Sequence, residues 1–240
     1  MRAASGSDER RGDEAWVALV PMRDHSERVP GKNYRAVAGR PLYEFILWTL
    51  LACPEVGRVV VDTDSPTIRQ GVAHVFPQVE LLERPAHLRD GDIPMNEIIA
   101  HDVEAVPARY YLQTHSTNPL LRSATVSSAI RTFESDSACD SLFSVTPVQV
   151  RLWSAEGLPI NHDPKVLLRT QDLPPVYEEN SCLYLFSREG FLAHRNRIGE
   201  KPRLFVIDPN EAWDIDEEAD LGIVEKLLAD RLAGGGPADA

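Results

Sequence analysis

Cationic side chains gather in the segment that follows the first apolar run of the chain. They are Arg23, Arg28 and Lys32, and Ser26 and Gly31 lie between them. A guanidinium group can grip a phosphate through two parallel hydrogen bonds, whereas an ammonium group acts as a point charge. Because such a set of cations is poor material for a core, the segment predicts a loop that binds a polyphosphate. The alternative is a solvated surface turn, and the glycine spacing of a Walker loop or of a dinucleotide fingerprint is absent.

Two acidic residues, Asp214 and Asp216, follow the last apolar run with one residue between them. On an extended backbone this spacing puts both carboxylates on the same side. Such a pair can hold Mg²⁺ through one or two oxygens and leave its other positions to water and substrate phosphates. The sequence therefore predicts a magnesium site at Asp214 and Asp216. The same acids would also suit the beginning of a helix, where negative charge is favourable.

Polar residues also follow two other apolar runs. Gln113, His115 and Asn118 stand in a dense polar turn, and Arg84 follows a shorter run. If these runs are parallel strands, the side chains lie at the same edge of the sheet as the cationic loop and face the same ligand. Turn chemistry alone also explains such residues, with Arg84 facing solvent, so both interpretations stay open at this point.

Short apolar runs rich in Val, Ile and Leu alternate with amphipathic stretches. Strands are expected at residues 16–22, 58–62, 79–82, 109–113, 141–146, 182–186 and 204–207. Helices are expected at residues 41–53, after a Ser65-Pro66 start, at 123–135 and at 217–232. This alternation is typical of an α/β fold. We expect a Rossmann-like, mostly parallel sheet flanked by helices, with the cationic loop at the carboxyl ends of its strands.

One domain is expected at residues 16–232, because a chain of this length suits a single fold. Residues 147–180 are polar and rich in proline, and they are too many for an ordinary connection inside a compact domain. We expect an arm there, about residues 147–180, that builds a homodimer. The polar ends, residues 1–15 and 233–240, are expected to be disordered tails.

The overall composition limits the classes of function. The chain has 240 residues and a net charge of −12, which argues against a nucleic-acid-binding protein because such proteins need a basic face. A local basic loop can still dominate its own cleft. Three widely spaced cysteines favour reduced thiols, residues 1–15 lack the apolar stretch of a signal peptide, and no apolar run approaches the ~20 residues of a membrane span. We expect a cytoplasmic protein that binds neither nucleic acid nor a membrane.

The order of these motifs resembles the acylneuraminate cytidylyltransferases, also called CMP-sialic acid synthetases, and the related 3-deoxy-manno-octulosonate cytidylyltransferases. The resemblance covers roughly residues 16–232. The family's Pro-x-Arg-x-x-Ser-x-x-x-Pro-x-Lys-Asn signature is met by Pro21, Arg23, Ser26, Pro30, Lys32 and Asn33. Other similar stretches are Asp62-Thr63-Asp64, Leu112-Gln113-Thr114, Pro119-Leu120 with Arg122, Tyr177 with Asn180, and Asp214-Ile215-Asp216 with Glu218 and Asp220.

The resemblance implies a concrete reaction. An acidic acceptor attacks the α-phosphorus of CTP, CMP is transferred and pyrophosphate leaves. Both reactants are anions, so cations and Mg²⁺ are needed to bring them together. The residues implied to bind the nucleotide are Arg23, Ser26, Arg28, Lys32, Asn33 and Arg84. Those implied to act in catalysis are Arg23, Lys32, Asp214 and Asp216, the last two as ligands of Mg²⁺.

One departure from the family pattern lies in the cationic loop, where Glu27 stands in place of the lysine of the sialic acid members and Arg28 follows it. The other departures lie on the acceptor side. Glu178 stands where the family's Tyr-Arg-x-Asn-Gly run has an arginine, and His115 and Asn118 replace residues of the usual Pro-Thr-Ser. These three residues and Gln113 are expected to contact the acceptor. The acceptor is expected to be a nonulosonate-type 2-keto acid sugar such as a sialic acid. A small phosphonate such as phosphonoformate is the alternative, because the family includes enzymes of phosphonate biosynthesis.

Two further classes of protein remain open. A catalytically silent nucleotide-binding subunit would keep this site and assemble a larger complex without turnover, and it would keep its partner after Asp214→Ala. A sugar-nucleotide glycosyltransferase also uses an Asp-x-Asp motif with a metal ion. It usually carries that motif in the middle of the chain, and it releases no pyrophosphate.

Overall fold

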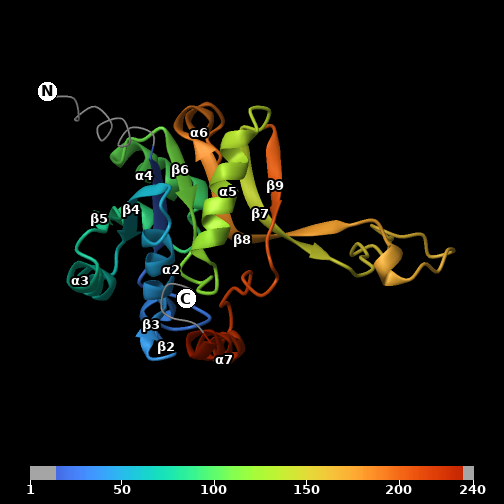
Figure 1. Cartoon of the computed structure of the whole chain (residues 1–240), viewed down its shortest axis with the longest axis horizontal. Helices are drawn as coiled ribbons and strands as arrows, with labels where there is room; N and C mark the ends of the chain where they lie inside the picture. Colours follow the sequence, from blue (N-terminus) through green and yellow to red (C-terminus); the bar gives the residue numbers. More distant parts are fainter. Residues whose placement is uncertain (1–14, 235–240) are drawn as a thin grey trace, which may run out of the picture.

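A seven-stranded sheet forms the centre of the protein (Figure 1). The computed structural model describes residues 15–234. The strands are β1 (Trp16–Met22), β4 (Val56–Thr63), β5 (Glu80–Glu83), β6 (Tyr110–Gln113), β7 (Ser141–Val148), β8 (Val176–Ser187) and β9 (Pro202–Val206). Most of the tails expected at 1–15 and 233–240 lies outside the described residues, and residues 233 and 234 belong to the last helix.

The sheet is mostly parallel, as the sequence predicts. Its strand order is β5-β4-β1-β6-β8-β7-β9. All neighbouring pairs are parallel except those of β8, which runs antiparallel to β6 and β7. The interior strand β1 is buried along its whole length, as is typical of a strand covered on both faces. The carboxyl ends of β1, β4 and β6 therefore meet at one edge. A short hairpin of β2 (Ala36–Val37) and β3 (Arg40–Pro41) lies apart from this sheet.

Helices cover both faces of the sheet. The helices α2 (Leu42–Leu51), α3 (Pro66–Val75) and α5 (Ser123–Ser135) share a core cluster with one face of β1. The helices α4 (Met95–Ala105) and α6 (Arg188–His194) share another cluster with its opposite face. The last helix, α7 (Glu218–Gly234), packs with α2 and the loop after β1 in a third cluster. Ser65 caps α3 by accepting a hydrogen bond from the backbone of Ile68, as expected.

Two helices were not predicted from the sequence. In α4 the buried positions include Ile98, Ile99 and Val103, but Asp102 is equally buried. A buried acid interrupts the apolar stripe on which a helix prediction depends. Helix α6 has only seven residues, which is too few for a clear periodicity.

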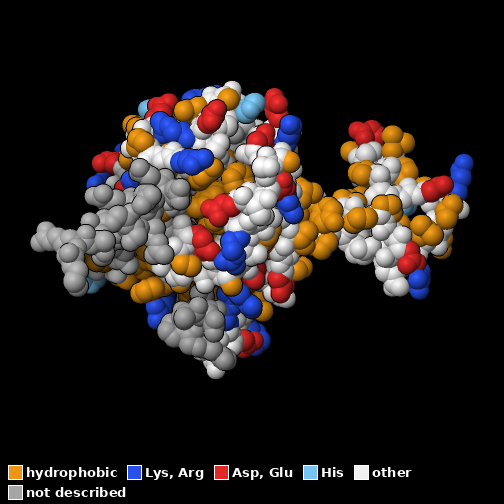
Figure 2. Space-filling model, turned by 45° about the horizontal axis from the view of Figure 1, so that its top comes forward, with side chains coloured by type: hydrophobic (Ala, Val, Ile, Leu, Met, Phe, Trp, Pro, Cys, Tyr) orange, Lys and Arg blue, Asp and Glu red, His pale blue; other side chains and the backbone are white. Residues whose placement is uncertain are grey.

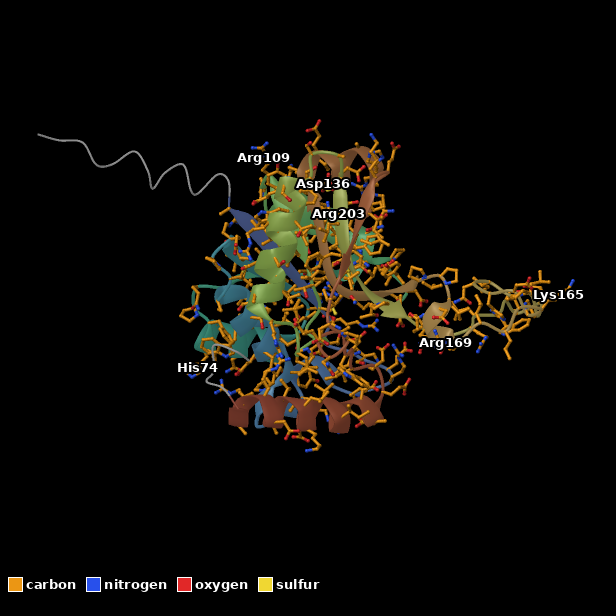
Figure 3. All side chains as sticks on the ribbon, turned by 45° about the vertical axis from the view of Figure 1, so that its right-hand side comes forward. His74, Arg109, Asp136, Lys165, Arg169 and Arg203 are labelled. Atoms are coloured by element: carbon orange, nitrogen blue, oxygen red, sulfur yellow. The ribbon has the colours of Figure 1, made fainter. Side chains whose placement is uncertain are left out.

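An extension projects from the body between β7 and β8 (Figures 1 and 2). It spans residues 149–175 and contains the bridge Trp153↔Pro159 and the short helix η3 (Thr170–Asp172). Lys165 and Arg169 lie far from the body in Figure 3. This is the segment in which the sequence predicts an arm. Among residues 15–234 no helix is long and apolar enough to cross a membrane.

A backbone irregularity in β8 falls beside the carboxyl edge of the sheet. The pairing of β7 with β8 jumps from Phe143↔Tyr184 to Val145↔Glu179. Inside this jump Ser181 adopts φ +58°. A left-handed conformation costs a non-glycine residue about 1–2 kcal/mol, and a β-branched side chain fits it worst. Ser181 therefore occupies a position that a glycine would fill without strain.

Substitutions at Ser181 test this strain. Ser181→Gly should leave the free energy of unfolding unchanged or raise it by up to about 1 kcal/mol, because relief of strain outweighs the added chain entropy. Ser181→Val should lower it by about 2 kcal/mol or more. Urea unfolding of both variants gives the comparison. Equal destabilisation by glycine and valine would mean that the hydroxyl group matters and not the backbone conformation.

Candidate active site

A cavity of about 350 Å³ opens at the carboxyl edge of the sheet. Among the residues that line it are nine that the sequence singled out: Arg23, Ser26, Arg28, Lys32, Asn33, Arg84, His115, Asp214 and Asp216. They come from the loops after β1, β5 and β6 and from the segment before α7. The parallel strands bring these loops together, as the switch-point rule for α/β sheets predicts.

The loop after β1 has a fixed shape. Gly31 adopts φ +66°, and a Cβ atom there would lie 2.7 Å from the ring of Tyr34, so only glycine fits. This turn leads directly to Lys32. The Nδ2 of Asn33 donates to the carbonyl of Arg23 at 2.7 Å, and its Oδ1 accepts from Ser116 at 2.7 Å. The buried Asn33 amide thus ties the cationic loop to the loop after β6.

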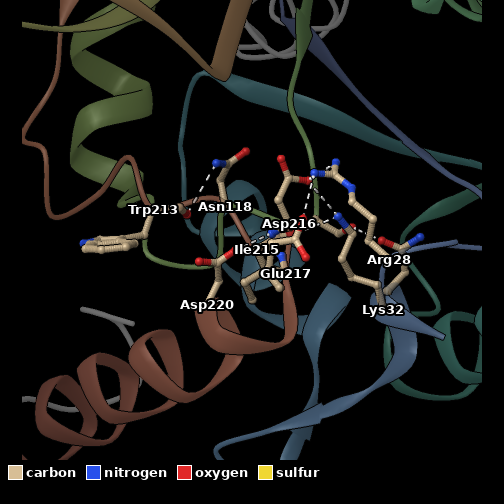
Figure 4. A network of polar contacts seen from close by, with 10 residues as sticks. Arg28, Lys32, Asn118, Trp213, Ile215, Asp216, Glu217 and Asp220 are labelled. Carbon is tan, nitrogen blue, oxygen red and sulfur yellow. Dashed lines mark hydrogen bonds and ion pairs between the residues drawn. The ribbon is translucent and has the colours of Figure 1, made fainter. Parts of the chain in front are cut away.

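Two of the three cations pair with an acid from the other end of the chain (Figure 4). Arg28 Nη2 lies 2.7 Å from Asp216 Oδ1, and Lys32 Nζ lies 3.3 Å from the same oxygen. Lys32 also donates to the carbonyl of Ile215 at 2.6 Å. The Lys32 side chain is only 15% exposed, so solvent screens its charge less than that of the half-exposed Arg28.

Arg23 lies at the wall of the same cavity. Among the described residues it forms no ion pair, and a Cβ atom on Gly91 would lie 2.8 Å from its Nη1. Glycine at position 91 therefore makes room for the guanidinium group. Of the three cations of this loop, Arg23 is therefore the one that forms no ion pair with a carboxylate in residues 15–234.

The donor set fits one magnesium ion held jointly with a substrate. Asp214 Oδ1 is buried and has no hydrogen-bond partner among the described residues. Burial raises the pKa of Asp214, and a hydrogen bond from Thr117 opposes that rise. No group of three or more His, Cys, Asp or Glu side chains in residues 15–234 is arranged as a complete metal site. Two carboxylates with substrate phosphates and water are nevertheless what Mg²⁺ commonly uses.

The segment that carries both aspartates is held by the backbone. Ile215 is fully buried, and its N–H donates to the carbonyl of Thr117 at 3.0 Å. Asp220 accepts hydrogen bonds from the N–H groups of Asp216 and Glu217 at 2.9 and 2.7 Å and so caps the approach to α7 (Figure 4). The fully buried Asn118 donates to the carbonyl of Trp213 at 3.5 Å and does not line the cavity.

Arg84 reaches the cavity from a buried charge network. Its Nε lies 2.9 Å from Asp62 Oδ2, and both side chains are at most 3% exposed. Asp102 from α4 is fully buried behind Asp62. Burial and the neighbouring Asp62 raise the pKa of Asp102 well above its usual value, which favours the protonated form of its carboxyl. The network holds the guanidinium of Arg84 in place.

The remaining predicted acceptor residues divide between two places. Gln113 is fully buried, and its Nε2 lies 3.0 Å from Nε2 of His115. Glu178 lines a second cavity of about 530 Å³, and this cavity meets the first at Ser181, Asp214 and Asp216. The two aspartates therefore stand between the cationic loop and the base of the extension.

Several residues at the site were not predicted from the sequence. Asp90, Ile93 and Met95 line the first cavity, and they lie in or beside the unpredicted helix α4. Their signal was the Pro94-Met95 start followed by apolar residues at helical spacing. Arg197 donates a hydrogen bond to Gln113. No sequence pattern identifies Arg197 as a site residue, because its partners Gln113 and Tyr184 lie in strands β6 and β8, away from it in the sequence.

Fold and site together define the class: an α/β enzyme that binds a nucleoside polyphosphate at the carboxyl edge of its sheet. A family model described as "Cytidylyltransferase" matches residues 17–232. The chain therefore belongs to the cytidylyltransferase family and is a CTP-dependent nucleotidyltransferase.

Relatives extend over nearly the whole chain. The chain is similar to the post-translational flagellin modification protein B of Campylobacter coli, with 24% identity over 90% of this chain and 95% of that protein. It is also similar to the CMP-N,N′-diacetyllegionaminic acid synthase of Legionella pneumophila, with 22% identity over 88% and 95%. The solved structure of a CMP:2-keto-3-deoxy-manno-octonic acid synthetase complexed with CTP has the same fold. It has a TM-score of 0.69 and 17% identity and covers 90% of this chain and 99% of that one.

The buried Asp102 should make the stability depend on pH. A carboxyl whose pKa is higher in the fold than in the unfolded chain binds its proton more tightly in the fold. The free energy of unfolding therefore falls as the pH rises above the unfolded pKa of about 3.9. Asp102→Asn imitates the protonated form and removes this loss. The melting temperature of Asp102→Asn minus that of the wild type should increase from about pH 4 to about pH 8.

The exposed Asp230, which pairs with Lys226 at the surface, provides the control. Asp230→Asn should shift the melting temperature little at any pH. A difference for Asp102→Asn that stays constant with pH would contradict the protonated state of Asp102.

Proposed function

We propose that this cytidylyltransferase transfers CMP from CTP to a nonulosonate-type 2-keto acid sugar, with Mg²⁺ as cofactor and pyrophosphate as the second product. One observation carries the proposal: Arg23, Arg28 and Lys32 line the same cavity as Asp214 and Asp216, and two of these cations contact Asp216 directly. This arrangement combines the cations that a triphosphate needs with the carboxylates that a magnesium ion needs.

Charge balance is the physical reason for the arrangement. The triphosphate and an acidic acceptor repel each other, by about 1 kcal/mol per pair of unit charges at ~4 Å in water and about 4 kcal/mol in a partly buried site. Lys32 and Arg28 now balance Asp216. A triphosphate competes for the same two cations, and this frees the Asp216 carboxylate to face a metal ion.

The transfer of CMP requires mainly that the protein positions the two reactants and stabilises the charge of the transition state. A bond forms between an acceptor oxygen and the α-phosphorus, the bond between the α-phosphorus and the bridging oxygen to the β-phosphate breaks, and pyrophosphate leaves with that electron pair. The acceptor proton is lost to solvent. Asp214 and Asp216 would hold Mg²⁺, which would supply charge neutralisation at the phosphates. Lys32 and Arg23 orient the phosphates, and the Asp62–Arg84 pair keeps one wall rigid.

The acceptor class is supported by the relatives and by the second cavity. Several relatives act, by their names, on legionaminic, pseudaminic and N-acylneuraminic acids, and others on 3-deoxy-manno-octulosonate. The second cavity, with Glu178 in its wall, adjoins the first at Asp214 and Asp216. A sugar acid bound in the second cavity would therefore lie beside phosphates bound in the first.

The extension is proposed to contact a second copy of the chain. It exposes an unusual number of large apolar side chains, with Leu167 at 88%. The exposed set is Val150, Trp153, Leu158, Ile160, Val166, Leu167 and Leu168. Figure 2 shows apolar side chains along this extension. Such a set on a projecting hairpin favours a homodimer. The three cysteines are free thiols, which fits the proposed cytoplasmic location.

Pyrophosphate release from CTP tests the reaction. The wild type should release pyrophosphate with Mg²⁺ and one of N,N′-diacetyllegionaminic acid, pseudaminic acid or a sialic acid. Asp214→Asn and Lys32→Met should each lower kcat by about 100-fold or more, because each removes charge placed at the reacting phosphates. Arg35→Met is the matched control, since Arg35 pairs with Glu218 at the surface.

The acceptor panel includes phosphonoformate. Turnover with phosphonoformate alone would replace the sugar acid by a small phosphonate. Absence of turnover with every acid, together with CTP binding that survives Asp214→Asn, would favour a silent nucleotide-binding subunit.

Apolar residues of the extension test the dimer. The double variant Leu158→Asp with Leu167→Asp should convert a dimer into a monomer in light scattering after gel filtration, because charge is costly in an apolar interface. Ile223→Asp, at an exposed apolar position on α7, should leave the dimer intact. A wild type that is already monomeric would contradict the proposal.

A further inference from the structure

A positively charged side chain lies behind the wall of the first cavity. Arg197, in the segment after α6, places its Cζ 3.6 Å from the centre of the Tyr184 ring, and its Nη1 donates to Oε1 of Gln113. Among the described residues it forms no ion pair with a carboxylate. Burial lowers the pKa of Arg197. A shielded guanidinium that contacts a ring and an amide and no carboxylate is costly for stability alone, which suggests a role in the site.

Arg197 determines how Gln113 points. A guanidinium group can only donate hydrogen bonds, so the carboxamide oxygen of Gln113 must face Arg197. The carboxamide nitrogen then points the other way. It donates to the carbonyl of Thr114 at 3.1 Å and faces Nε2 of His115 at 3.0 Å. The orientation of this buried amide follows from the chemistry of its neighbour.

The orientation of Gln113 in turn fixes the proton of His115. Because Gln113 donates, Nε2 of His115 must accept, and the ring carries its proton on Nδ1. The ring is neutral: burial lowers the pKa of His115 to about 3, and the positive charges of Arg197 and Lys32 contribute. No described residue receives a hydrogen bond from Nδ1, and His115 lines the first cavity.

We propose that Arg197 is the positioning residue of the acceptor side: through Gln113 it holds His115 as a neutral Nδ1–H donor for an oxygen of the anionic acceptor. This inference rests on the proposed function. The ligand class is an acid that offers a carboxylate or hydroxyl oxygen beside the α-phosphate, and Arg197 adds positive charge behind that oxygen. The cation that the family pattern has at position 178 is an acid in this chain, and Arg197 supplies positive charge from another segment.

Neighbouring residues hold Arg197 in this position. The hydroxyl of Tyr184 donates to Glu179 and contacts Ser181 Oγ at 3.3 Å, which fixes the ring under the guanidinium group. Glu179 also favours the charged form of Arg197. The Tyr184 ring that lies under the guanidinium group therefore comes from β8, and Gln113 comes from the neighbouring strand β6.

Steady-state kinetics with Arg197→Met provide the first test. Methionine keeps most of the volume but removes the charge and the donor. With N,N′-diacetyllegionaminic acid, pseudaminic acid and a sialic acid as probes, the KM of the accepted acid should rise about tenfold. The KM of CTP should change less than about twofold. Arg197→Lys should restore part of the loss. Arg195→Met is the control, because Arg195 makes only exposed ion pairs, at 3.7 and 3.8 Å.

Nitrogen NMR of the histidine rings provides a second test that needs no turnover. The His115 signals, assigned by their loss in His115→Gln, should show a protonated Nδ1 and an unprotonated Nε2 in the wild type and in Arg195→Met. In Arg197→Met the amide of Gln113 can turn over, and the spectrum should change to a mixture of tautomers.

The two tests separate the inference from the function on which it rests. A wild type without turnover on any acid overturns the proposed function, while the NMR spectra still decide the role of Arg197. Turnover by the wild type, with an unchanged acceptor KM and an unchanged His115 tautomer in Arg197→Met, overturns the inference alone.

Discussion

The contact of Lys32 with Asp216 joins two segments that are 184 residues apart in the sequence. Its strength comes from partial burial of the ammonium group, because the same pair at the surface would contribute little. Arg28 shares the carboxylate but is half exposed. The contact therefore keeps a cationic loop and an acidic segment of opposite charge within reach of one ligand, and most of the site is arranged around it.

Side-chain hydrogen bonds and apolar packing bring the cationic loop and the acidic segment together. The buried Asn33 amide fastens the loop after β1 to the loop after β6. Ile215 belongs to the cluster in which α7 packs with the amino end of α2. Because neutral hydrogen bonds and apolar packing hold the backbone that carries these charges, only side chains need to exchange partners when a ligand arrives. Such preorganisation of the backbone is a main contribution of a protein to phosphoryl-type transfer.

The meeting of the cationic loop with the aspartate pair could be predicted because each of the two sets is local in sequence. The loop from Arg23 to Asn33 and the Asp214–Asp216 pair each follow a strand, and parallel strands bring such loops to one edge. Helix α4 was missed because Asp102 interrupts its apolar face. The length of strand β8 was underestimated, because its first half, which includes Glu178, is polar and leaves the body at the base of the extension. Arg197 was missed because its partners, Gln113 and Tyr184, meet it only in the folded chain.

Calorimetric titration of CTP with and without Mg²⁺ tests the central claim most directly, namely that cations and carboxylates exchange partners around a triphosphate. The account predicts that removal of Mg²⁺ weakens CTP binding about tenfold or more, because the carboxylates of Asp214 and Asp216 would then repel the phosphates with no cation to neutralise them. It also predicts that binding weakens as the salt concentration rises. An affinity for CTP that is the same with and without Mg²⁺ would contradict the account.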